Sequence, residues 1–92
     1  MEFEWNSRKA AQNLKKHGVS FHEAATVFGD PLAITYSNPD HSDDEDRFLT
    51  FGHTSAGRLI VVAHVDREDR TRIVNPRPVT CKERRAHEEG LR

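Results

Sequence analysis

The sequence has little cysteine and no long apolar run. Cys81 is the sole cysteine among the 92 residues, so no disulfide can form within the chain, and such thiol use is typical of a reducing compartment. The longest apolar run, residues 59–63, is far shorter than the roughly 20 residues that cross a bilayer. Residues 1–9 contain no apolar stretch of the kind found in signal peptides. We therefore expect a cytoplasmic protein that makes no contact with a membrane.

Metal ligands at familiar spacings are also missing. No two histidines are separated by three residues, and Cys81 has no cysteine partner. The acidic loop at residues 40–46 lacks the D-x-D-x-D-G spacing that a calcium loop requires. We expect no metal and no other cofactor, and we interpret these acidic residues as a solvated loop that could contact a basic partner.

Length and composition predict one small domain over residues 1–92. Apolar residues make up 35% of the chain and charged residues 32%, which is a low apolar share for a well-buried domain. A chain of this length folds around a modest core. A core of this kind is typical of proteins that associate with a partner or with themselves.

The residue patterns predict an α+β fold in the order β-α-α-β-β-β-β-α. Asn6 can cap the first helix, and S-x-x-E at Ser20 and T-x-x-E at Thr80 are capping boxes. We expect the two amino-terminal helices to cover one face of an antiparallel sheet, with a short helix at the carboxyl end. The expected strands are residues 2–5, 32–36, 48–54, 58–65 and 70–75, the last one ended by prolines, and the expected helices are residues 7–16, 21–28 and 81–89.

Basic residues are concentrated in residues 70–87, although the whole chain has a net charge of -1. Such segregation creates a local field, and arginine can grip a phosphate bidentately. This indicates a phosphate-bearing partner, with RNA first because its 2′-hydroxyl can act as a nucleophile. The alternative is a solvated face whose arginines pair with acids elsewhere. The segment contains one acid, Glu83, and six cations: Arg70, Arg72, Arg77, Lys82, Arg84 and Arg85.

Three titratable residues are candidates for proton transfer. Glu83 and His87 are four residues apart and should share one helix face, as a general base and a general acid. Glu83 has a structural alternative, because it completes the capping box with Thr80. The alternative for His87 is an ordinary exposed residue on a terminal helix. His64 follows the apolar run, where it is either a buried, hydrogen-bonded histidine, which we favour, or a proton-transfer group at the edge of the basic segment.

Four segments along the chain carry a resemblance to a known family: EWNSRKAAQNLKKHGVSFHEAATVFGDPLA, DHSDDEDRFLTFGHTSAGRLIVVAHV, RIVNPR and ERRAHEE. In these segments the chain resembles the BrnT family of toxins, within the wider RelE-like group. The resemblance implies an antiparallel sheet with helices packed against it and an endoribonuclease activity that inhibits translation. It also implies a BrnA-like ribbon-helix-helix antitoxin as partner. Operator DNA would be bound only through that complex, which could be a heterotetramer.

The chain departs from the family's pattern near the end of the last strand. The family usually reads Ser-Ala-Arg-basic-Ala, whereas this chain retains Arg77 but has Pro78 at the basic position, and His87 stands where tyrosine is common. From the resemblance and these residues we expect Arg72 and Arg77 to hold the scissile phosphate, Glu83 or His64 to take the 2′-hydroxyl proton, and His87 to protonate the leaving oxygen. We expect the remaining cations of the segment to bind RNA: Arg70, Lys82, Arg84 and Arg85. The alternative function is a weakened toxin that serves mainly as an antitoxin-binding co-repressor.

Overall fold

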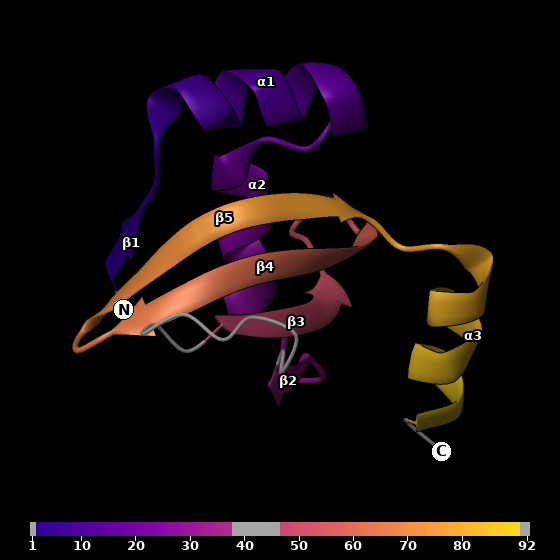
Figure 1. Ribbon diagram of the computed structural model, residues 1–92. Helices are drawn as coiled ribbons and strands as arrows, with labels where there is room; N and C mark the ends of the chain where they lie inside the picture. The colour runs from indigo at the N-terminus through magenta and orange to yellow at the C-terminus, as the bar shows by residue number, and fades with distance from the viewer. Residues whose placement is uncertain (1, 38–46, 91–92) are drawn as a thin grey trace.

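The computed structural model describes residues 2–37 and 47–90 (Figure 1). The predicted α+β class and element order are confirmed, and the second helix divides into an α-helical and a 3₁₀ part. The acidic loop at residues 40–46 lies outside the described residues. The elements are β1 (Glu2–Glu4), α1 (Ser7–His17), α2 (Phe21–Ala25), η1 (Thr26–Gly29), β2 (Ile34–Ser37), β3 (Arg47–His53), β4 (Leu59–Arg67), β5 (Arg70–Pro78) and α3 (Cys81–Gly90).

The strands form one sheet in the order β1-β5-β4-β3-β2. Strands β2 to β5 pair antiparallel, as predicted. The sheet is nevertheless mixed, because β1 pairs with the start of β5 in parallel, with Glu2 opposite Arg70 and Glu4 opposite Arg72. Residue alternation predicts that a segment is a strand but not its direction, which here depends on how the chain returns after both helices.

Strand β5 continues through Pro76 and Pro78 rather than ending at residue 75, so that part of the prediction was wrong. The two prolines lie opposite Val62 and Ile60 of β4, beyond a register shift between Ala63 and His64. Among the described strands, β1 covers β5 only as far as Arg72, so the prolines stand on the sheet edge, where no N–H is needed.

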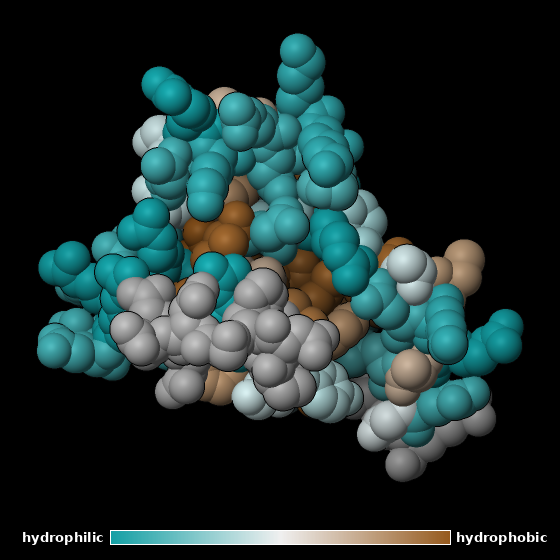
Figure 2. Space-filling view, viewed as in Figure 1, coloured by the Kyte–Doolittle hydropathy of each residue, from teal (hydrophilic) through white to brown (hydrophobic). Residues whose placement is uncertain are grey.

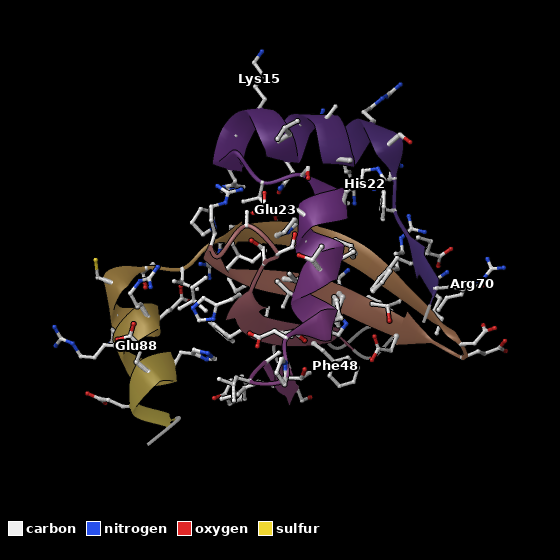
Figure 3. The ribbon with its side chains drawn as sticks, turned by 180° about the vertical axis from the view of Figure 1, so that it is seen from behind. Lys15, His22, Glu23, Phe48, Arg70 and Glu88 are labelled. Atoms are coloured by element: carbon white, nitrogen blue, oxygen red, sulfur yellow. The ribbon has the colours of Figure 1, made fainter. Side chains whose placement is uncertain are left out.

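The hydrophobic core lies between one face of the sheet and the helices α1, α2 and η1. Figure 3 views this face and shows α2 in front of the strands. The aromatic rings of Trp5 and Phe21 meet edge to face at 5.9 Å, and those of Phe3 and Phe28 lie 5.3 Å apart. The fully buried apolar side chains of this core are Val19, Phe21, Ala24, Val27, Ile60, Val62 and Ile73.

The helix ends have the capping bonds that the sequence predicts. Asn6 Oδ1 accepts from Lys9 N, Ser20 Oγ from Glu23 N, and Thr80 Oγ1 from Glu83 N. Helix α1 ends at Gly18, whose φ of 71° is left-handed and therefore suits glycine. Within the part of the chain that the structure describes, no helix is long and apolar enough to span a membrane.

Two features of this fold position the candidate site. The sheet face opposite α1 and α2 carries neither of these helices, and α3 leaves the end of β5 and lies beside that end of the sheet (Figure 1). Residues at the end of β5 and on α3 can therefore meet residues of β3 and β2, which lie beyond β4 in the sheet.

Candidate functional site

A bidentate ion pair joins the end of β5 to the first turn of α3. The Nη1 and Nη2 atoms of Arg77 donate to Glu83 Oε1 and Oε2 at 2.8 and 2.9 Å, and Nη1 also donates to the Pro78 carbonyl at 3.1 Å. Glu83 Oε1 also accepts from Thr80 N at 2.8 Å, which completes the predicted capping box. These hydrogen bonds connect the end of β5 with the first turn of α3, and they fix the direction of α3 relative to β5.

This pairing strongly affects the acidity of both partners. Hydrogen bonding from Arg77 lowers the pKa of Glu83 to about 2, against the opposing effect of partial burial. The same bond raises the pKa of Arg77. Glu83 is therefore ionised throughout the physiological range, but a carboxylate of such low pKa is a weak proton acceptor.

His87 lies on the same face of α3 as Glu83, as the four-residue spacing predicts. Its side chain is buried, with 5% of the residue exposed, and its Nε2 has no hydrogen-bond partner among the described residues. Buried polar atoms without a partner are uncommon in proteins. The ring contributes to a pocket of about 290 Å³ between α3 and the sheet, lined by Tyr36, Phe51, Glu83, Ala86 and His87.

His53, at the end of β3, is the second histidine beside this pocket. Its ring centroid lies 6.3 Å from that of His87, and its Nδ1 lies 3.7 Å from Asp30 Oδ2. The backbone N–H of His53 donates to the same oxygen at 2.8 Å, and this bond is the main reason why the pKa of Asp30 is lowered.

Sequence reasoning assigned no role to His53, Phe51 or Tyr36. Alternation along β3 places Phe51 and His53 on one face, and Tyr36 lies beside Phe51 on the neighbouring strand. That alternation was a usable signal. What the sequence did not show was that α3 lies beside this end of the sheet (Figure 1).

His64 lies away from this cluster, on the face that the helices cover. The residue is only 2% exposed, its Nε2 lies 2.7 Å from Thr50 Oγ1, and its Nδ1 lies 2.9 Å from Asp66 Oδ1. Its ring also meets that of Phe28 edge to face at 4.9 Å. This is the favoured interpretation of a buried, hydrogen-bonded histidine, and the structure does not bring His64 together with Arg77 and His87.

The predicted basic segment is spread along the molecule rather than gathered in one patch. Arg70 lies at the far end of β5, 3.5 Å from Glu2 and 3.9 Å from Glu4. Arg77 is seven residues further along the strand, and at about 3.3 Å per residue this places the two arginines roughly 20 Å apart. Arg72 lies between them. The cations of α3 (Lys82, Arg84 and Arg85) are exposed, and Arg84 lies 3.8 Å from Glu88.

Most of the chain matches one known protein family. Residues 5–83 match the model of a family described as ribonuclease toxin, BrnT, of type II toxin-antitoxin system. The chain belongs to the BrnT family. No curated protein matches the chain. By its family, the protein is a ribonuclease toxin of a type II toxin-antitoxin system. Such a toxin has an antitoxin as its partner.

The BrnT match covers most of the candidate site but not all of it. Arg72, Arg77, Glu83 and His53 fall inside residues 5–83, whereas His87 lies beyond them. The part of α3 that closes the pocket is therefore a feature of this chain that the family match does not include. Nowhere in residues 2–37 and 47–90 do three His, Cys, Asp or Glu side chains gather in a way that could hold a metal ion.

Proposed function

We propose that this BrnT-family protein is a metal-independent endoribonuclease that cleaves RNA and thereby inhibits translation. The observation that carries the proposal is the meeting of Arg77, Glu83 and His87 where β5 passes into α3, on the sheet face that α1 and α2 leave free. A cation can stabilise the charge that develops on a phosphodiester during transesterification, an anion can orient that cation, and an imidazole can transfer a proton.

In this mechanism Arg77 binds the scissile phosphate and stabilises the charge that develops on it. The 2′-oxygen attacks phosphorus, the bond to the 5′-oxygen breaks, and His87 donates a proton to that leaving oxygen. The products are a 2′,3′-cyclic phosphate and a 5′-hydroxyl. Arg72 lies five residues before Arg77, roughly 16 Å along the strand, so we assign it to a neighbouring phosphate, together with the exposed cations of α3.

The proton of the 2′-hydroxyl needs an acceptor. Glu83 is ionised, but it is a weak base because the hydrogen bond from Arg77 lowers its pKa to about 2. Its bidentate contact with Arg77 suits a role in orienting that arginine. His53 is the alternative, because its ring lies 6.3 Å from that of His87 and two imidazoles at that separation can reach oxygens of one phosphodiester. His64 is left with a role in the fold.

The test is cleavage of single-stranded RNA by the purified protein, with the new 5′ ends mapped and their chemistry determined. We expect 5′-hydroxyl ends that require Arg77 and His87. The matched control is Arg8→Ala, which removes an exposed arginine of α1 and should leave cleavage unchanged. A double variant Arg77→Ala, His87→Ala that cleaves as fast as the parent would refute the assignment.

The antitoxin partner is proposed to be a BrnA-like ribbon-helix-helix protein, in a complex such as a heterotetramer that binds operator DNA through the antitoxin. An acidic or amphipathic antitoxin segment would cover Arg72, Arg77 and Arg84 and so block RNA. Adding the antitoxin should raise the Tm with concentration, since a ligand of the folded state stabilises it. A Tm that does not respond to added antitoxin would contradict this partnership.

A second function has a specific observation in its favour. Glu83 and the Pro78 carbonyl already accept from the terminal nitrogens of Arg77, so an incoming phosphate must compete with them. This favours a weakened toxin whose main role is to bind the antitoxin and co-repress the operator. Growth arrest on expression without antitoxin, relieved by Arg77→Ala, would exclude this alternative.

A further inference from the structure

The pocket between α3 and the sheet has aromatic walls and a polar rim. Tyr36 and Phe51 meet edge to face, with ring centroids 5.7 Å apart and an interplanar angle of 83°. Tyr36 is 52% exposed, so about half of its surface is open to an incoming group. Figure 2 views this side of the molecule, where apolar side chains are visible in the middle with hydrophilic ones around them.

Polar groups of α3 border the same space. Glu83 Oε1 accepts two of the hydrogen bonds described above, whereas Oε2 accepts only the bond from Arg77 among the described residues. Oε2 therefore keeps a lone pair for another donor. His87 adds a buried ring whose Nε2 has no partner within the described part of the chain. The pocket thus offers one hydrogen-bond acceptor and one unsatisfied nitrogen beside two aromatic rings.

We propose that this pocket binds one unstacked nucleobase of the RNA, next to the phosphate held by Arg77, and so selects the base beside the cut. The inference rests on the proposed ribonuclease function. Proteins that read single-stranded RNA stack splayed bases on aromatic side chains and bind their polar edges. The pocket volume of about 290 Å³ accommodates one base. Glu83, which lines the pocket, also accepts a hydrogen bond from Arg77, so the bound base and the bound phosphate can belong to neighbouring nucleotides of one RNA strand.

The position of Glu83 predicts which bases the pocket prefers. A carboxylate accepts from the exocyclic amino group of cytosine, and adenine and guanine carry such a group as well. Uracil has none, and its carbonyl oxygens would face the negative charge of Glu83. We therefore expect a base with an amino group, such as adenine or cytosine, in the pocket in preference to uracil.

The first experiment measures binding without cleavage. Short single-stranded oligonucleotides of adenine, cytosine or uracil, and an abasic chain of the same length, carry 2′-O-methyl groups that prevent cleavage, and their Kd is measured by fluorescence anisotropy. Tyr36→Ala should weaken binding of the adenine or cytosine chain about ten-fold, within the roughly 5- to 150-fold range that base stacking supports. It should leave binding of the abasic chain unchanged, because that chain has no base to lose.

Two controls separate stacking from general damage. Tyr36→Phe keeps the ring and should bind as the parent does. Leu32→Ala removes a side chain of similar exposure, 55%, that does not line the pocket, and it should also bind as the parent does. Ala86→Trp fills the pocket from α3 and gives an independent test, with the same selective loss expected. The proposal would be overturned if Tyr36→Ala and Leu32→Ala changed the Kd equally. It would also be overturned if the parent protein bound the abasic chain as tightly as the chains that carry bases.

Cleavage then distinguishes this inference from the function on which it rests. Mapped cuts of the parent protein should show one enriched base beside the cut, and Tyr36→Ala should remove that enrichment while cuts continue. Cuts without any base enrichment would overturn the pocket and leave the ribonuclease standing. Selective binding without cuts would refute the ribonuclease alone. A Tyr36→Ala protein that binds RNA normally but loses the antitoxin would assign the pocket to the antitoxin instead.

Discussion

The Arg77–Glu83 pair yields a prediction whose size follows from the structure. Glu83→Gln removes the charge but keeps a side chain that can complete the capping box with Thr80, since glutamine serves at that position as well. The fall of the Glu83 pKa from 4.5 to about 2 corresponds to about 3 kcal/mol of folding free energy at most. The side chain of Arg77 is 36% exposed, so water screens the pair, and we expect a loss of about 1–2 kcal/mol.

The same pair fixes how this loss depends on pH. Because the folded pKa of Glu83 is lower than the unfolded one, its contribution is fully present above pH 4.5 and disappears as the pH falls from 4.5 towards 2. The parent and Glu83→Gln should therefore differ at neutral pH and converge in acid. The assay is urea unfolding of both proteins at several values between these limits, which compares their free energies of unfolding at each pH.

The control for this measurement is Glu88→Gln on the same helix. Glu88 is 60% exposed and lies 3.8 Å from Arg84, a surface pair that should contribute little. If Glu83→Gln is as stable as the parent at neutral pH, the pair contributes nothing to folding. If the difference is the same in acid as at neutral pH, its origin is not the charge of Glu83, and the reasoning from its pKa is refuted.

Three further substitutions test other parts of the fold and site. Asn13→Ala should lower the free energy of unfolding by about 2 kcal/mol in urea titration, because the buried Nδ2 donates to the Val19 and Pro76 carbonyls at 3.2 and 2.9 Å; unchanged stability would show that water replaces it. Gly52→Ala should cost about 1–3 kcal/mol in the same assay, since its Cβ would meet Val27 Cγ1 at 2.9 Å, and parental stability would mean that the core relaxes around it. His64→Gln should lower the Tm but leave the RNA cleavage rate per folded molecule unchanged, and a rate that falls without a change in Tm would return His64 to the catalytic group.

Local signals predicted the helices well, because capping involves residues only a few positions apart. Asn6, Ser20 and Thr80 make the bonds expected of them, and the helical spacing of Glu83 and His87 places both beside one pocket. The favoured interpretation of His64 also followed from local pattern, since an apolar strand indicates burial and a buried imidazole needs partners.

Long-range arrangement was less predictable. The parallel pairing of β1 depends on the path of the whole chain. The continuation of β5 through its prolines is possible because, among the described strands, none pairs with the outer side of β5 beyond Arg72. Charge along the sequence suggested one basic patch, but an extended strand carries Arg70 roughly 20 Å from Arg77. The aromatic wall came from Tyr36 and Phe51, whose meeting with α3 requires the tertiary structure.

The prolines at the end of β5 also restrict how the molecule associates. A strand joining a sheet edge needs N–H donors that point outwards at alternate positions, and Pro76 and Pro78 supply none, while the outward carbonyl of Pro76 already accepts from Asn13. This stretch is therefore closed to strand addition, both by a second copy of the chain and by an extended segment of a partner. Before its antitoxin arrives, this protein is thus protected at this edge from self-assembly into larger sheets.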